Sequence, residues 1–95
     1  MTASDFQKVK DILSQNGVEF AGIFGSRARG EEKPESDIDI MIRFKEGKTK
    51  GLLELISLER KLSEILGLEV DLITQDSISP YIKESVLKDL KVIYQ

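Results

Sequence analysis

Apolar residues recur along this 95-residue chain with two different periods, which replace one another several times. Stretches in which they return every three to four residues predict amphipathic helices, and short apolar or alternating runs predict strands. The stretch 37–44 alternates most clearly, with isoleucines on one face and Asp37, Asp39, Met41 and Arg43 on the other. Helices are predicted at 4–15, 51–66 and 81–89, and strands at 18–24, 37–44, 68–73 and 90–94.

Capping signals mark the ends of the predicted helices. Ser4 with Gln7 three residues later resembles a capping box for the first helix, and Gly67 ends the second. Ser79 followed by Pro80 is a suitable N-cap and first-turn pair for the third helix. The order of these elements predicts an α/β fold, a sheet with helices packed on it, in one domain spanning 1–95.

The second predicted helix carries leucines and isoleucines at helical spacing. A partner-facing surface would fit this stripe, but a chain of this length needs most of its helical leucines for its own core. Tyr81 and Tyr94 are also expected to be partly buried aromatic residues with a packing role. The residues expected on the buried side of the second helix are Leu52, Leu55, Ile56, Leu62, Ile65 and Leu66.

The composition removes several classes of chemistry. Because the chain has no Cys and no His, it cannot form a Ser-His-Asp triad, use a thiolate nucleophile or hold zinc through His and Cys. Disulfides are impossible, which fits a reducing cytoplasm. Acid–base or metal chemistry would have to come from carboxylates, Lys, Tyr or Ser, with a hard cation such as Mg²⁺ or Mn²⁺ as the metal.

Charge and hydropathy argue against nucleic acid and membrane as partners. The chain has 14 Lys and Arg against 17 Asp and Glu, a net charge of −3, which disfavours non-specific polyanion binding. No apolar run approaches the roughly 20 residues of a membrane helix, and the first residues lack the layout of a signal peptide. We therefore expect a soluble cytoplasmic protein.

The first candidate motif is the turn 25–30, directly after the strand that ends at residue 24. Gly25 and Gly30 allow the backbone to approach a ligand closely, and consecutive N–H groups there can form an anion nest. The hydroxyl of Ser26 and the guanidinium groups of Arg27 and Arg29 could add contacts to a phosphate. Taken alone, the segment fits an ordinary turn with solvated arginines better.

The second candidate motif is a set of aspartates on predicted strands. Asp37 and Asp39 project from one strand face about 6.5–7 Å apart, so the pair lies either on a solvated face or beside a divalent cation that offsets its repulsion. Asp71 lies inside the later apolar strand and could complete a three-carboxylate cluster if the two strands are neighbours. Glu69 projects to the same face, but Val70 and Leu72 bracket Asp71, which makes Asp71 the better candidate.

Three segments together resemble the minimal nucleotidyltransferases of the DNA polymerase β superfamily: GSRARG at 25–30, SDIDI at 36–40 and VDL at 70–72. The resemblance extends over nearly the whole chain and implies a single-domain nucleotidyltransferase core with a mixed sheet. It implies ATP as the substrate and transfer of AMP to a hydroxyl with release of pyrophosphate.

The resemblance also implies roles for individual residues. Gly25 and Ser26 would cradle the β- and γ-phosphates, with Arg27, Arg29 and Ser36 as further nucleotide-binding residues.

The aspartates would be both metal ligands and catalytic residues. Asp37 and Asp39 would ligate two Mg²⁺ ions, with Mn²⁺ as an alternative. Asp71 would help to bind the metal on the nucleophile side and would orient or deprotonate the attacking hydroxyl.

Small members of this superfamily resemble the MNT antitoxin of HEPN/MNT toxin–antitoxin pairs. That resemblance implies a HEPN-domain toxin as partner, with a tyrosine hydroxyl of the toxin as the AMP acceptor. The alternative is a binding module that neutralises its partner by complex formation without catalysis. A nucleic-acid-modifying transferase that acts alone is weakened by the acidic charge and the few aromatic residues.

Overall fold

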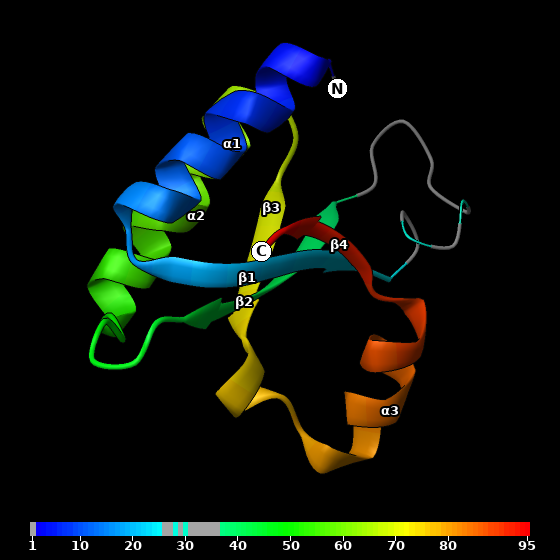
Figure 1. Cartoon of the computed structure of the whole chain (residues 1–95). Helices are drawn as coiled ribbons and strands as arrows, with labels where there is room; N and C mark the ends of the chain where they lie inside the picture. Colours follow the sequence, from blue (N-terminus) through cyan, green and yellow to red (C-terminus); the bar gives the residue numbers. More distant parts are fainter. Residues whose placement is uncertain (1, 26–27, 29, 31–36) are drawn as a thin grey trace.

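Four strands form one mixed sheet in the order β3-β2-β1-β4 in the computed structural model, which describes residues 2–25, 28, 30 and 37–95 (Figure 1). Strand β1 is antiparallel to both of its neighbours, whereas β2 and β3 are parallel. The predicted α/β fold with a mixed sheet is confirmed. The strands are β1 (Val18–Phe24), β2 (Ile38–Phe44), β3 (Val70–Thr74) and β4 (Lys91–Tyr94), and the helices are α1 (Ala3–Gln15), α2 (Leu52–Leu66), α3 (Pro80–Asp89) and the 3₁₀ turn η1 (Gln75–Ser77).

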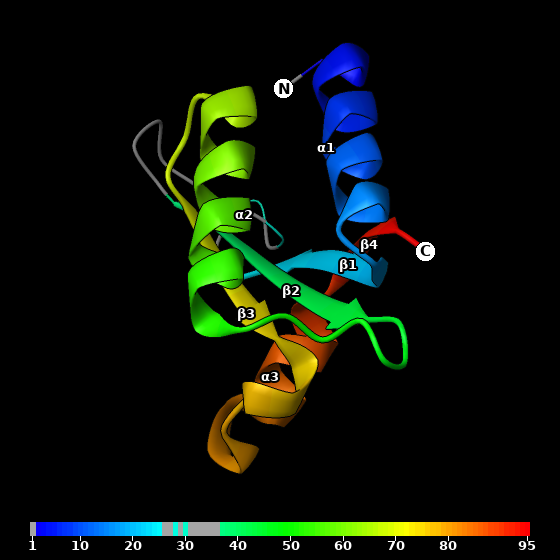
Figure 2. The same cartoon turned by 90° about the vertical axis from the view of Figure 1, so that its left-hand side faces the viewer.

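Helices cover both faces of the sheet. Figure 2 shows α1 and α2 side by side on one face and α3 on the other. The main core lies under α1 and α2, where Leu13 and Leu62 meet the isoleucines of β2, all of them 1% exposed or less. The alternation in β2 therefore directs its odd-numbered residues toward α3. Met41 is also buried on that side, so the α3 face is partly covered rather than open along its whole length.

Gly22 allows the end of α3 to approach the sheet. This glycine is the β1 partner of Met41, and a Cβ added to it would lie 2.6 Å from Cδ1 of Leu90, the residue that follows α3. Any larger residue would push the end of α3 away from the sheet. The contact holds α3 beside the part of β1 that leads to the glycine turn.

The start of α1 differs from the prediction. Thr2 is the N-cap: its hydroxyl accepts a hydrogen bond from the Asp5 N–H, and the Asp5 carboxylate accepts one from the Thr2 N–H, both at 3.1 Å. The predicted box of Ser4 and Gln7 is wrong, because the helix already begins at residue 3 and the Gln7 amide instead donates to Asp11. The equivalent prediction at α3 is confirmed, since the Ser79 hydroxyl accepts from the Tyr81 N–H at 3.3 Å.

The buried side of α2 is also narrower than predicted. Leu58 and Leu62 are buried, and Leu55, Ile65 and Leu66 pack partly against the core. Leu52 and Ile56 are 72% and 43% exposed, and their predicted burial is wrong. Both lie in the first turns of α2, before Leu58, the first residue of this helix that is fully buried. Leu53, beside them, is 79% exposed.

The two tyrosines differ in their environment. Tyr94 on β4 packs partly buried against the core, as predicted. Tyr81 is 97% exposed, so the predicted packing role is wrong for this residue. It lies in the first turn of α3, five residues before Val86, the buried residue of this helix.

Within the described residues, no helix combines the length and the apolar character that crossing a membrane would require.

Candidate active site

The parallel pair of β2 and β3 brings Asp39 and Asp71 side by side. The two residues are direct partners in the strand register, so their side chains leave the same face of the sheet from strands about 4.8 Å apart. Asp39 is partly buried and Asp71 is exposed. The condition set by the sequence, that the two strands are neighbours, is met. Glu69 precedes the first residue of β3 and lies outside the strand.

Asp37 lies outside the strands that carry Asp39 and Asp71. It is exposed and directly precedes β2. Among the residues that the structure describes, no three acidic side chains come close enough to form a ready-made metal-binding group. The strands therefore bring Asp39 and Asp71 into register, and Asp37 lies two residues before Asp39, outside β2.

Gly25 joins the glycine turn to this pair. It directly follows β1, and its φ of +78° is a conformation that residues with a side chain rarely adopt. A Cβ at this position would overlap the Asp39 carboxylate. Phe24, the residue before it, is the register partner of Asp39. Two demands therefore select glycine here: the left-handed backbone and the carboxylate that lies against it.

Only part of the glycine turn is described. Gly30 has a φ of +74° with open space around the position of a Cβ, and Ala28 is buried. The predicted nucleotide-binding residues Ser26, Arg27, Arg29 and Ser36 lie outside the described residues.

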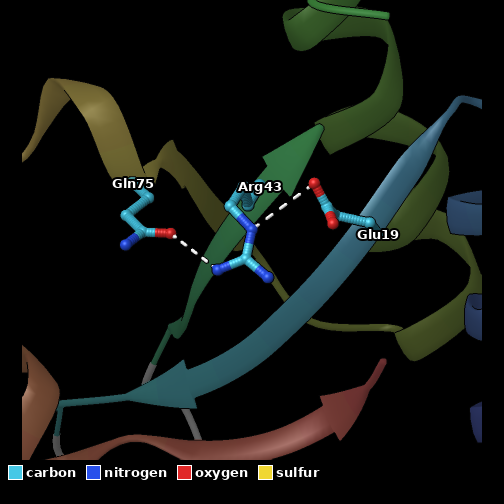
Figure 3. Close-up of polar contacts among 3 residues, drawn as sticks. All are labelled: Glu19, Arg43 and Gln75. Atoms are coloured by element: carbon cyan, nitrogen blue, oxygen red, sulfur yellow. Dashed lines mark hydrogen bonds and ion pairs between the residues drawn. The ribbon is translucent and has the colours of Figure 1, made fainter. Parts of the chain in front are cut away.

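Arg43 forms a polar contact on the same face as Asp39 that the sequence did not reveal. Its Nε lies 3.5 Å from an Oε of Glu19 on β1, and one of its terminal nitrogens donates to the Gln75 side chain at 3.3 Å (Figure 3). Its guanidinium carbon lies 5.2 Å from the ring centroid of Phe20. Alternation along β2 could place Arg43 on this face. Its partners come from β1 and η1, and no spacing in the sequence predicts these contacts.

Arg43 links the sheet to the connection that leads to α3. Its side chain is 47% exposed and that of Glu19 40% exposed, so the ion pair contributes little to stability. Arg43 is four residues along β2 from Asp39, about 13 Å at the usual rise of a strand. We therefore assign it to the attachment of η1 to the sheet and not to the candidate site.

Known proteins resemble this chain in sequence and in fold. The family model of the nucleotidyltransferase domain matches residues 6–93. The chain is 48% identical over 83 residues to MJ0435 of Methanocaldococcus jannaschii, which is provisionally named a protein adenylyltransferase, with 87% of each chain covered. It is 41% identical over 81 residues to the protein adenylyltransferase MntA of Thermococcus cleftensis, across 85% of this chain and 80% of that one.

A solved structure shares this fold. The crystal structure of a toxin–antitoxin with AMP-PNP contains a chain that superposes with a TM-score of 0.80 at 26% sequence identity, covering 94% of this chain and 72% of that one.

Proposed function

Since this chain belongs to the nucleotidyltransferase domain family, we propose that it transfers AMP from ATP to a hydroxyl of a partner protein and acts in this way as an antitoxin. It is a nucleotidyltransferase, and the nucleotide and acceptor are the proposed parts. The observation that carries the proposal is the meeting of Gly25, Asp39 and Asp71 from three different strand ends at one place. The names of its relatives, protein adenylyltransferases, support AMP as the transferred group.

We propose that Asp39 and Asp71, joined by Asp37, hold divalent cations, two Mg²⁺ or alternatively Mn²⁺. Two carboxylates in register on adjacent strands concentrate negative charge, which favours a bound cation. Their oxygen atoms are the ligands that hard cations prefer. When bound, such cations neutralise the charge of a triphosphate and lower the pKa of a hydroxyl nucleophile.

The chain's own residues then have distinct tasks. Gly25 would let backbone N–H groups approach the phosphates closely, with Ser26, Arg27, Arg29 and Ser36 as further contacts of the nucleotide. The acceptor oxygen would form a bond to the α-phosphorus while the bond from that phosphorus to pyrophosphate breaks.

The acceptor would approach on the β3 side. Asp71 is exposed there, so it would hold the acceptor hydroxyl and take its proton as the new bond forms. Holding the two reactants in line would supply most of the rate enhancement.

The proposed partner is a HEPN-domain toxin, and the proposed acceptor is one of its tyrosine hydroxyls, in the cytoplasm. The structural neighbour that is a toxin–antitoxin with AMP-PNP supports a partner of this kind and a nucleotide in the complex. A separate acceptor also fits a chain in which the described residues form little beyond the sheet and its helices.

Intact-mass measurement of the partner tests this function. The wild-type chain with ATP and Mg²⁺ should add AMP to the toxin, and Asp39→Asn should abolish the addition while the protein stays folded. Asp76→Asn is the matched control, because Asp76 is an exposed aspartate on η1 away from the pair. If the toxin is neutralised by Asp39→Asn as well, and its mass changes with neither protein, the chain is a non-catalytic binding module.

A further inference from the structure

The two edge strands of the sheet, β3 and β4, differ in how far other elements cover them. At β3, helix α2 closes the edge: the Leu72 N–H donates to a carboxylate oxygen of Glu59 at 2.9 Å, and the Val70 N–H donates to the Ser63 hydroxyl at 3.0 Å. These amides point away from β2, toward the side of β3 on which a further strand would have to bind. Edge strands protected in this way do not pair with further strands.

The opposite edge is formed by β4, which pairs with β1 and, among the described residues, with no other strand. Val92 in this strand is 49% exposed. A hollow of about 360 Å³ follows the strand, lined by residues 92–95 and by Lys10 of α1. Figure 2 shows α1 above β4 at this border of the sheet. The edge thus combines unpaired strand backbone, exposed apolar surface and a cationic wall.

We propose that an extended segment of the partner protein docks along β4 as an added strand. The backbone of an edge strand offers alternating N–H and C=O groups, which an extended segment satisfies and a helix does not. An apolar side chain of that segment would cover Val92, and an acidic side chain would face Lys10. The proposal rests on the proposed function only in taking the partner to be the toxin.

Charge argues against a second copy of this chain as the occupant. In a β4–β4 pair the added strand would be residues 91–95, which contain Lys91 and no acidic side chain. That strand would bring a second cation to the hollow that Lys10 lines, and two positive charges at short range repel each other. The complementary occupant is therefore a different chain that carries a carboxylate.

Docking at this edge is compatible with transfer. Asp39 and Asp71 lie on β2 and β3, and β1 separates them from β4. An added strand next to β4 would leave the face with the two carboxylates open. Binding and AMP transfer could then take place in one complex.

Partner affinity measured by calorimetry tests the docking edge. Val92→Lys and Lys10→Glu should each weaken binding of the toxin at least tenfold, about 1.4 kcal/mol. Leu53→Lys, the same kind of change at the exposed start of α2, should leave the affinity unchanged. Hydrogen exchange should slow at the amides of 91–94 when the partner is added. Thermal unfolding confirms that each variant is folded.

Several outcomes would overturn the docking proposal. Unchanged affinity in Val92→Lys, or a loss of affinity in Leu53→Lys alone, would contradict it. So would a wild type that does not bind the toxin. Slow exchange of 91–94 in the isolated chain at high concentration would indicate a second copy as the occupant. The proposed function is separable: Asp39→Asn should bind as tightly as the wild type without transferring AMP. A wild type that binds through β4 and never modifies the toxin would contradict the function alone.

Discussion

Gly25 is the residue at which backbone conformation and chemistry are most closely linked. We expect Gly25→Ala to reduce AMP transfer at least a hundredfold, because its Cβ would displace the Asp39 carboxylate, and a misplacement of about 1 Å can cost two orders of magnitude in rate. The measurement is the initial rate of AMP incorporation into the partner.

Gly47→Ala is the matched control for this substitution. Gly47 has a φ of +77°, close to that of Gly25, and no atom lies within 4 Å of the position of its Cβ. Both variants should lose about 1 kcal/mol of stability from the left-handed backbone, but only Gly25→Ala should lose activity. Equal rates in the two variants would show that the overlap with Asp39 has no catalytic importance.

Asp5 makes the stability of α1 depend on pH. The hydrogen bond from the Thr2 backbone N–H lowers the pKa of Asp5 below its ordinary value of 3.8. Because the folded-state pKa is depressed, the stabilisation is present above about pH 3.8 and is lost as the pH falls through the folded pKa. Asp5→Asn should therefore melt below the wild type at neutral pH, and the difference should shrink in acid.

The N-cap of α1 can also be tested at Thr2. Thr2→Ala should lower the free energy of unfolding by about 1 kcal/mol, whereas Ser4→Ala should have almost no effect because Ser4 is not the cap. Both losses are measured by denaturant unfolding. A larger loss in Ser4→Ala than in Thr2→Ala would support the capping box of Ser4 and Gln7 instead.

Side-chain environments were only partly predictable from residue types. The Thr2 and Asp5 box and the Ser4 and Gln7 pair both match the general spacing, and only the observed start of α1 separates them. Tyr81 could not be separated from Tyr94 either. Their exposure depends on which residues of distant elements pack against each ring, and no local pattern contains that information.

At the scale of elements, α2 has a second role beyond covering the core. We expect Glu59→Ala to destabilise the protein by about 1–3 kcal/mol, because the Leu72 N–H would lose its acceptor at a buried residue. Glu59→Gln keeps an acceptor oxygen and should lose less. Glu54→Ala, an exposed carboxylate in the first turn of α2, serves as the control, all three measured by urea unfolding. Equal losses of stability in Glu54→Ala and Glu59→Ala would contradict the role of Glu59 as the acceptor for the Leu72 N–H.

The helices and strands themselves were predictable within a residue or two, because their apolar periods are long and uninterrupted. The pairing between them was not. Periodicity says nothing about which strands are neighbours, so the alignment of Asp39 with Asp71 depended on the β2–β3 register. The exposed start of α2 was missed for a related reason: helical spacing defines a stripe of apolar residues but not which of them the core covers.

At the scale of the molecule, the sheet separates three kinds of surface. One face holds the core under α1 and α2. The other face carries Asp39 and Asp71 on β2 and β3, with α3 against β1, and among the described residues no further strand pairs with β4. The absence of His and Cys could be read from composition and agrees with a site built from carboxylates. The closed β3 edge and the contacts of Arg43 could not be predicted, because each joins residues from elements far apart in sequence.

The origin of the transferred group tests the central claim most directly. The purified chain is incubated with its partner, Mg²⁺ and ATP that is radiolabelled either at the α-phosphate or at the γ-phosphate. If this chain is an adenylyltransferase of its partner, label from the α-position enters the partner, label from the γ-position does not, and Asp39→Asn transfers neither. Label entering from the γ-position, or neutralisation of the partner without any label, would contradict the account.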